Sequence, residues 1–326
     1  MNTKQKKAAL FMRLIAGAIG MGLTMPLTAA PTLNGFFDMG GEYDSNVGVK
    51  ELDQLSRESD WAATASAGAT LDWTISPGWT FSAGAQYDHK HYRTFSAYDQ
   101  AGVRGHVDMS YRFSPLTVGL NHHAVVVQLD REPFLTLSRS GLYAGKMLTS
   151  HLYLRAQVSQ QTKSIASQPA RDAEGLGWAL ESYWFSDDAS RYWTAAIAVE
   201  DEQANRHDYS NQALSVRLGW SNQFSLLNKN SQLQLQWRYL DRGYDGPGIS
   251  PEVTSLGQSA LNPSQAAMPT PANRSDLVQQ WEAKWRLSVN DVLSLGTQLV
   301  YADHRSNLAT ADYTETTASV TARLSF

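Results

Sequence analysis

The sequence predicts an all-β fold, namely a transmembrane antiparallel up-and-down β-barrel of the outer-membrane type with about 14 strands. Polar and apolar residues alternate over most of the chain, the alternating segments run for about 10 to 16 residues, and short turns alternate with longer polar loops. Strands of soluble proteins usually run for only about 5 or 6 residues. Segments of about 10 residues or more have the length needed to cross a bilayer at a tilt.

The first 30 residues differ from the rest of the chain. The stretch MNTKQKKAALFMR is basic, LIAGAIGMGLTMPL is apolar, and TAA supplies small residues for a peptidase. A membrane-spanning helix is the alternative, but it needs roughly 20 apolar residues and this run is shorter. We therefore expect residues 1–30 to be a signal peptide and residues 31–326 to form the barrel.

Alternation with a period of two is clearest in SQLQLQWRYL (231–240), QWEAKWRLSV (280–289) and VRGHVDMSYRF (103–113). WAATASAGATLDW (61–73) shows the same period with smaller residues, and no helical stripe of comparable length occurs. Such segments are typical of strands with one apolar face. In order along the chain, we expect strands near 33–47, 60–75, 79–92, 98–113, 115–128, 134–146, 150–163, 173–186, 190–202, 208–224, 231–244, 274–289, 291–304 and 312–326.

The connections between these segments also alternate in length. Short turns are expected at 76–78, 114–115, 149–150, 187–190, 225–230 and 290–291, and longer polar loops at 48–59, 163–172, 203–208, 245–273 and 305–311. Two further connections, near 93–97 and 129–133, are short and weaken the contrast. This arrangement is typical of outer-membrane barrels, with longer loops outside the cell. An even number of strands predicts that both termini are periplasmic, in the outer membrane of a Gram-negative bacterium.

A soluble β-sandwich or propeller is the alternative fold. It would explain neither the strand length nor an apolar face rich in Trp, Tyr and Leu. In a bilayer a spanning sheet must close on itself, because every backbone polar group needs a partner within the protein. We expect the apolar face to contact outer-membrane lipids and aromatic residues near the strand ends to form interfacial girdles: Trp73, Trp79, Phe113, Trp184, Trp193, Trp220 and Trp285.

The composition excludes several functional classes. The chain has 27 basic and 31 acidic residues, a formal net charge of -4, which argues against nucleic-acid binding. It has no cysteine, so disulfides and thiolate metal sites are excluded. The mean hydropathy of -0.36 is low for a membrane protein, as expected when half of each strand lines a polar lumen.

The alternation directs a set of mostly charged side chains into the lumen. These are Arg104, His106, Asp108, Arg112, Arg155, Glu181, Arg217, Arg238, Glu282, Lys284, Arg286 and Arg323. They could pair with one another across neighbouring strands and stiffen the wall, or line a hydrated conduit that selects solutes. The segment 245–273 could constrict or cover the mouth, or it could be a surface loop.

Catalytic, metal and cofactor sites are not indicated. His207 lies beside Asp208 in a longer loop, whereas the Asp187–Asp188 pair falls on a short turn at the opposite end, so no catalytic group is assembled. Neighbouring His122 and His123 point to opposite faces of a strand, and His89 and His91 alone would make a weak metal site. We therefore expect no enzyme activity, no catalytic residue, no metal and no cofactor.

Two stretches resemble a known family. The first strand contains GGEYDSNVGV (40–49), and the last three strands run from NRSDLVQQWEAKWRLSV through YADHRSN to TETTASVTARLSF (273–326). These stretches resemble the C-terminal barrel of the surface lipoprotein assembly modifier family, an outer-membrane secretion barrel of 14 strands. Members usually carry tetratricopeptide repeats before the barrel, and no such helical repeat is present here.

The resemblance implies a transport or secretion conduit that translocates a lipoprotein or soluble protein partner to the cell surface. The alternatives are a porin-like diffusion channel for small polar solutes, an exopolysaccharide export pore, and an adhesion barrel that displays the loop 245–273. In the final segment, Val320, Ala322, Leu324 and Phe326 share the apolar face. Such a segment resembles the signal read by the barrel-assembly machinery, which we expect to be a partner.

Overall fold

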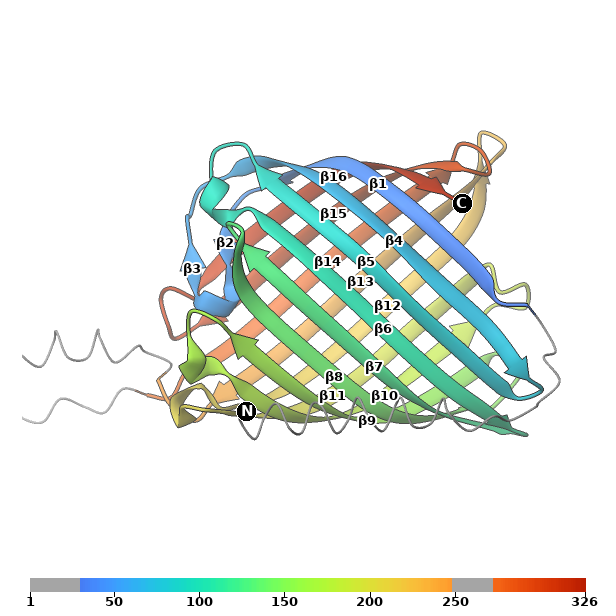
Figure 1. The fold of residues 1–326 in the computed structure, drawn as a ribbon, viewed down its shortest axis with the longest axis horizontal. Coiled ribbons are helices and arrows are strands. Elements are labelled where there is room, and N and C mark those ends of the chain that lie inside the picture. The colour runs from blue at the N-terminus through green and yellow to red at the C-terminus, as the bar shows by residue number, and fades with distance from the viewer. Residues whose placement is uncertain (1–29, 248–271) are drawn as a thin grey trace, which may run out of the picture.

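The computed structural model describes residues 30–247 and 272–326, which form a closed antiparallel barrel of 14 strands (Figure 1). The predicted fold class is confirmed. The strands are β1 (Thr32–Asp44), β4 (Asp60–Ser76), β5 (Trp79–Tyr92), β6 (Gln100–Phe113), β7 (Leu116–Leu129), β8 (Glu132–Met147), β9 (Leu152–Ile165), β10 (Ala173–Phe185), β11 (Arg191–Ala204), β12 (Asn211–Leu226), β13 (Lys229–Tyr244), β14 (Ser275–Ser288), β15 (Leu293–Ser306) and β16 (Tyr313–Ser325). The predicted signal peptide (1–30), apart from residue 30, and most of the predicted loop 245–273 lie outside the described residues.

Each strand pairs with its neighbours in sequence, and β1 closes the barrel by pairing with both β4 and β16. At the closure Asp38 lies opposite Arg323 and Phe36 opposite Ser325. Two backbone hydrogen bonds between Gly35 and Phe326 extend this pairing by one step. Because the sheet has no free edge, all its strands find partners within the barrel, as a bilayer requires.

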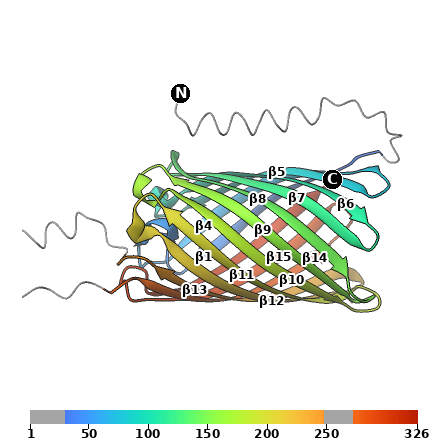
Figure 2. The ribbon, with the colours of Figure 1, turned by 90° about the horizontal axis from the view of Figure 1, so that it is seen from below.

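The two ends of the barrel differ (Figures 1 and 2). At the turn end, the connections β4–β5, β6–β7, β8–β9, β10–β11, β12–β13 and β14–β15 are short, and Thr32 and Phe326 lie there as well. At the loop end, the connections contain short pieces of secondary structure. The first loop contains β2 (Gly48–Val49), η1 (Lys50–Leu52) and β3 (Gln54–Leu55). Three other loops contain one 3-10 turn each: η2 (Ser96–Tyr98), η3 (Pro169–Arg171) and η4 (His207–Tyr209).

Two predicted strand ends are displaced for local reasons. The segment predicted at 208–224 begins at Asn211, because the chain before it forms η4. The segment predicted at 33–47 ends at Asp44, whose carboxylate accepts hydrogen bonds from the Asn46 N–H at 3.0 Å and the Tyr92 hydroxyl at 2.8 Å. The chain then leaves the wall and enters the first loop.

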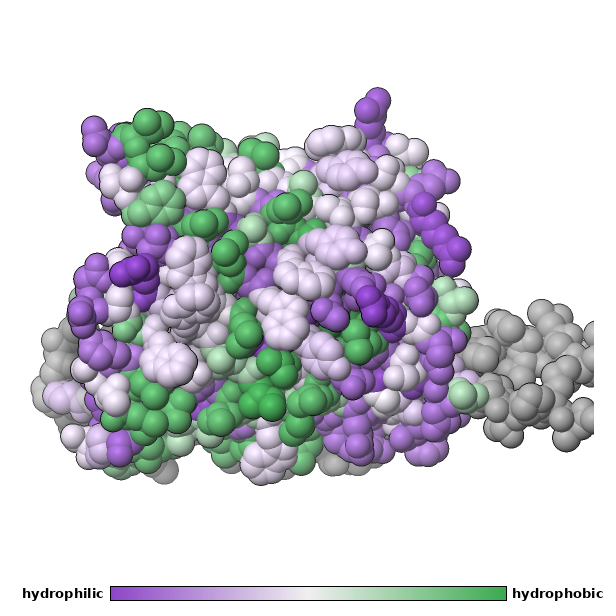
Figure 3. Space-filling model, turned by 180° about the vertical axis from the view of Figure 1, so that it is seen from behind, coloured by the Kyte–Doolittle hydropathy of each residue, from purple (hydrophilic) through white to green (hydrophobic). Residues whose placement is uncertain are grey.

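The outer wall is apolar, as the alternation requires. Large side chains on this face are about half exposed, among them Trp61, Trp178, Trp184, Trp193 and Ile197. In Figure 3 apolar and near-neutral side chains cover much of the wall, and hydrophilic ones gather toward the two ends. Among the described residues, no helix is long and apolar enough to cross a membrane.

The buried apolar side chains gather at the loop end. Val47 packs with Ala62 and Tyr92, and Val49 packs with Phe134 and Ile165. Both clusters contain residues of the first loop, which we call the mouth loop (residues 45–59). Among the described residues, both clusters of buried apolar side chains therefore lie where this loop meets the wall.

Candidate functional site

The mouth loop crosses the open end of the barrel. It begins after β1, yet Val49 packs against residues of β8 and β9, which lie five and six strands away around the sheet. Inside the loop, β2 and β3 pair tightly, and a Cβ on Gly48 would lie 2.6 Å from Leu55 and 2.7 Å from the Gln54 carbonyl. Only glycine fits this close approach. The loop thus reaches far into the mouth as a compact hairpin.

The two valines hold the loop in place by burial. Val47 is fully buried and Val49 is 3% exposed. Burial of a valine side chain contributes at most about 1.5–3 kcal/mol relative to leaving it in water. Two such contacts hold the loop against the inner wall of the barrel.

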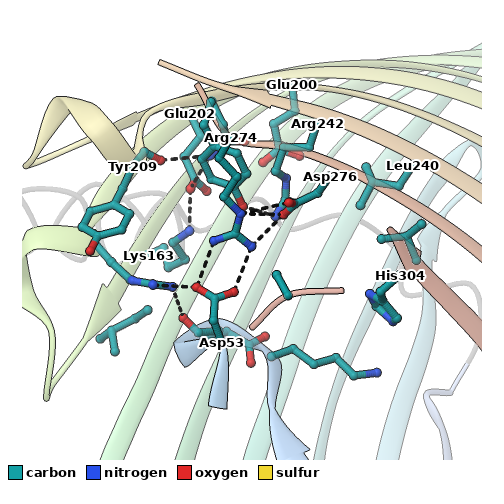
Figure 4. Close-up of a pocket in the computed structure, with 18 of the residues that line it drawn as sticks. Asp53, Lys163, Glu200, Glu202, Tyr209, Leu240, Arg242, Arg274, Asp276 and His304 are labelled. Atoms are coloured by element: carbon teal, nitrogen blue, oxygen red, sulfur yellow. Dashed lines mark hydrogen bonds and ion pairs between the residues drawn. The ribbon is translucent and has the colours of Figure 1, made fainter. Parts of the chain in front are cut away.

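Asp53 joins the tip of the mouth loop to two other loops (Figure 4). Its carboxylate accepts hydrogen bonds from Arg274 at 2.8 and 2.9 Å and from Arg171 at 2.7 Å. Arg171 also donates to the Glu51 carbonyl at 2.6 Å, and Arg274 also binds Asp276 at 2.7 Å. Arg171 precedes β10 and Arg274 precedes β14, so this latch ties together three loops from separate parts of the wall.

The opposite charges of the latch residues stabilise the ionised forms of Asp53 and Arg274. Burial by itself would raise the pKa of Asp53, but the hydrogen bonds and charges of Arg274 and Arg171 outweigh it and hold that pKa below its usual value. Burial would lower the pKa of Arg274, but Asp276 and Asp53 raise it. The latch is therefore fully ionised near neutral pH.

A cavity of about 380 Å³ lies between the mouth loop and the wall formed by β8–β16. Eight basic and five acidic side chains line it, a net formal charge of +3, although the whole chain carries -4. We call it the mouth cavity; its lining includes Lys50, Arg139, Glu200, Arg238, Arg242 and His304.

Most of these charges are paired, but two arginines are not. Arg139 bridges to Glu200 at 2.9 Å and Lys163 to Glu202 at 2.5 Å, both across the interior from β8 or β9 to β11. Among the described residues, Arg238 has no acidic partner, and Arg242 has only the Tyr244 hydroxyl at 3.4 Å. The Nε atoms of both arginines are buried without a hydrogen-bond acceptor.

The predicted lumen-lining residues fall into paired and unpaired groups. Arg104 binds Asp88 at 2.8 Å, Arg323 binds Asp38 at 2.5 Å, and Lys284 binds Glu282. Several others make polar or ring contacts: Asp108 with the Tyr143 hydroxyl at 2.8 Å, Arg155 with Gln157 at 2.8 Å and the Tyr143 ring, Glu181 with Tyr183 at 3.4 Å, and His106 with the His123 ring at 6.1 Å.

The remaining four are arginines without an ion pair in the part of the chain that the structure describes: Arg112, Arg217, Arg238 and Arg286. Arg217 lies directly opposite Arg238 in the β12–β13 register. Of the twelve predicted residues, only Arg238 lines the mouth cavity. Their role in lining a conduit stays a prediction, as does that of Val320, Ala322, Leu324 and Phe326 in assembly.

The sequence predicted a loop at 48–59, but it did not predict that this loop folds into the mouth. It also did not predict the latch, or Glu200 and Glu202 as pairing partners across the cavity. The one available signal was SNVGVKEL (45–52), where two valines interrupt a polar loop. The latch residues gave no signal, because single Asp and Arg residues in loops are ordinarily solvated.

The histidine pairs behave as the alternation predicts. His122 bonds to Ser140 at 2.9 Å and His123 stacks on His106, so the neighbours point to opposite faces. His207 lies 3.5 Å from Asp245. Within the described ranges, no group of three His, Cys, Asp or Glu residues could hold a metal ion.

Comparisons with known proteins identify the fold class and no family. No protein-family model matches the chain, and no curated protein matches it. Solved structures match over nearly the whole barrel at low identity. An anion-selective porin from Comamonas acidovorans matches with a TM-score of 0.51 and 9% identity, over 91% of this chain and 99% of that one. OmpT with loop L8 deleted, an outer membrane protein of Vibrio cholerae, matches with a TM-score of 0.50 and 7% identity, over 91% and 100%.

A bacterial polysaccharide outer membrane secretin also matches, with 12% identity over 90% of this chain and 97% of that one, at a TM-score of 0.45 that supports no inference. The barrel is of the Gram-negative outer-membrane type, a fold that it shares with the Comamonas porin and with OmpT. The likeness to the surface lipoprotein assembly modifier family stays a resemblance between short motifs.

The expectation that this chain is not an enzyme needs correction. Its structural neighbours include several structures of OmpT, an outer membrane protein. Neither the barrel fold nor the lack of an assembled catalytic group excludes catalysis. At 7% identity these matches show the fold alone, and no enzymatic activity is established.

Proposed function

We propose that this protein is a diffusion channel for small polar solutes, with a preference for anions. The observation that carries the proposal is the pair Arg238 and Arg242 in the mouth cavity, which has an excess of positive charge. Charged rings and clusters at a constriction select permeating ions, because an ion entering a narrow space loses part of its water and needs a compensating charge.

The mouth loop favours small solutes. It is fixed by buried valines and by the Asp53 latch, so it narrows the path that a solute takes along the barrel. A folded protein or lipoprotein would need this loop to leave the mouth, which breaks the latch and exposes both valines. The geometry therefore supports protein translocation less well than diffusion of small solutes.

Arg238 and Arg242 are suited to attract an anion without holding it tightly. Among the described residues, neither guanidinium is paired with a carboxylate, and Arg217 adds a third positive charge opposite Arg238. Glu200 lies on the same cavity wall but is engaged by Arg139. An entering anion thus meets an uncompensated charge and can leave again, as conduction requires.

The test is ion selectivity in planar bilayers, from the reversal potential in a KCl gradient. The wild-type barrel is expected to favour chloride, and Arg238→Glu is expected to lower the chloride-to-potassium permeability ratio roughly twofold to tenfold, where tenfold corresponds to about 1.4 kcal/mol. Arg191→Glu is the matched control, because Arg191 carries the same charge at the exposed start of β11 at the turn end. Its selectivity should equal that of the wild type.

A folded barrel that never conducts would exclude the channel. A channel that favours potassium, or whose selectivity is the same in Arg238→Glu and the wild type, would exclude the assigned role of the arginines. We further propose that the loop end faces the cell exterior and the turn end the periplasm, in line with the lengths of the connections.

A further inference from the structure

A row of aromatic rings lies inside the barrel at the turn end, opposite the mouth loop. It consists of Tyr153, Tyr183, Phe185 and Tyr192, with ring centroids 6.0, 6.4 and 6.0 Å apart in that order. These residues come from the turn-end portions of β9, β10 and β11. By strand alternation they share the inward face with Arg155 and Glu181, so the row is separate from the apolar outer wall.

The row does not serve as a packed core. Tyr183, Phe185 and Tyr192 are only partly buried, and both hydrophobic clusters of the described residues lie at the other end of the barrel. Tyr153 lies over Gly145, where an added Cβ would come within 2.0 Å of its hydroxyl oxygen. Aromatic rings set against the wall of a polar lumen present flat apolar surfaces to whatever passes.

Beside this row is a second, smaller cavity of about 210 Å³, which we call the turn-end pocket. Tyr183 and Tyr192 line it on β10 and β11, and β11–β14 supply polar side chains on the same inward face: Thr194, Ser221, Gln234, Gln236, Glu282 and Lys284. Its volume restricts an occupant to a small molecule or to one unit of a longer one.

The polar side chains of the pocket include neutral hydrogen-bonding groups. Within the described part of the chain, the amides of Gln234 and Gln236 have no hydrogen-bond partner, so each keeps two donors and an acceptor for a ligand. Glu282 and Lys284 form an ion pair with each other, which leaves no net charge. The site therefore differs from the mouth cavity, where unpaired arginines favour anions.

Flat rings with amides close beside them match one class of ligand. A sugar ring has an apolar face of C–H groups, which stacks on an aromatic ring, and a rim of hydroxyls, which needs donors and acceptors together. A nucleobase or another aromatic solute would stack as well, but it would use few of these polar groups. Binding sites generally combine apolar walls with a few placed polar groups in this manner.

We propose that the turn-end pocket and the aromatic row form a saccharide-binding subsite inside the channel. The proposal deepens the proposed function, because a solute that passes the mouth cavity would next meet these rings before leaving at the turn end. Each sugar unit would stack on Tyr183 or Tyr192 and exchange hydrogen bonds with Gln234 and Gln236. The rings of the row are spaced closely enough to pass a sugar from one to the next.

The experiment measures block of the ion current by maltotriose in planar bilayers. Maltotriose is expected to reduce the wild-type current at millimolar concentrations, whereas a polyethylene glycol of similar mass, which lacks ring faces and most hydroxyls, should block far less. The double variant Tyr183→Leu/Tyr192→Leu should need about tenfold more maltotriose for the same block. Tyr301→Leu, a tyrosine on the outer face of β15, is the matched control and should behave as the wild type.

Two further variants keep the test decisive if the double variant does not fold. Tyr183→Phe keeps the ring and should keep the block, and Gln236→Ala removes an unpartnered amide and should weaken the block. Equal block by the glycol and maltotriose, or equal block of all variants, would overturn the subsite. Stronger block by adenosine than by maltotriose would assign the rings to aromatic solutes instead.

The proposal of the subsite and the proposal of the channel can be tested separately. If the folded barrel conducts no ions, the proposed function fails, and saturation-transfer NMR of maltotriose with the detergent-solubilised protein then tests the pocket directly. Transfer that the wild type shows and Tyr183→Leu/Tyr192→Leu lacks would support the pocket, and no transfer in the wild type would overturn it. A conducting barrel without block removes the subsite alone.

Discussion

At the scale of single residues, the most consequential side chain is Asp53. Its two partners, Arg171 and Arg274, are 118 and 221 positions away in the sequence. Three charged groups buried together stabilise one arrangement of the loops, since removal of one member leaves the others without a partner. The position of the mouth loop therefore depends on one carboxylate as well as on the two valines.

Replacement of Asp53 by Asn should loosen the mouth loop. The variant leaves Arg171 without its carboxylate partner and weakens the hold on Arg274, at a cost of about 1–3 kcal/mol. Each 1.4 kcal/mol changes the ratio of released to seated loop by about tenfold, so single-channel recordings should show larger and noisier current steps. Glu51→Gln is the matched control, because it removes one charge from the same loop but keeps the backbone carbonyl that accepts from Arg171. Identical traces for Asp53→Asn and the wild type would contradict the role of the latch.

The same carboxylate predicts a pH dependence. Because the pKa of Asp53 is lowered from its usual value of 3.8, its contribution is complete above that value and is lost as the pH falls through the lowered pKa. Current steps should therefore be constant from neutral pH down to about 4 and become larger and noisier below it. In Asp53→Asn this transition should be missing. A transition between pH 5 and 7 would point to a histidine instead.

At the scale of elements, strand β1 contributes to both the closure of the barrel and the position of the mouth loop. It closes the barrel against β16 and leads directly into the mouth loop. At the seam the Phe326 ring lies over Gly35, where a Cβ would come within 2.3 Å of it, and two backbone hydrogen bonds join these residues. Only a glycine leaves room for the ring at this point of the seam.

Phe326→Ala should therefore impair barrel formation. Loss of the ring uncovers the seam beside Gly35, and we expect the yield of folded barrel to fall at least about twofold. The measurement is the fraction of outer-membrane protein that shows heat-modifiable mobility on gels. Leu227→Ala is the control, because Leu227 in the β12–β13 turn is 83% exposed and Phe326 is 82% exposed. Wild-type yield of Phe326→Ala would remove this residue from the predicted assembly signal.

At the scale of the whole molecule, the lumen has two regions with different side-chain chemistry, one at each end of the barrel. The mouth cavity has a positive excess in a chain whose net charge is negative, and the turn-end pocket is neutral and aromatic. In the proposed channel, a solute passes the positive mouth cavity first and the aromatic row second. The mouth cavity depends on closure of the sheet, which brings β8 and β9 opposite the loop that follows β1.

Much of this architecture could be predicted from the sequence. The period of two gives both faces of every strand, because successive side chains of a strand must point to opposite sides. SQLQLQWRYL and QWEAKWRLSV therefore identified the faces of Gln234, Arg238 and Lys284 without coordinates. Strand length and turn spacing gave the strand number and the closed form, because a bilayer accepts no open sheet edge.

Only the tertiary structure decided what the mouth loop does, which arginines lack partners, and which rings lie beside which amides. Asp53 meets Arg274, Arg139 meets Glu200, and Tyr192 faces Gln234 because the sheet curls and closes. Contacts of this kind join strands that are not paired with each other, and a local alternation pattern has no means of encoding them. The sequence by itself determined a membrane barrel with a polar lumen, and closure in three dimensions decided where in that lumen charge and aromatic surface are concentrated.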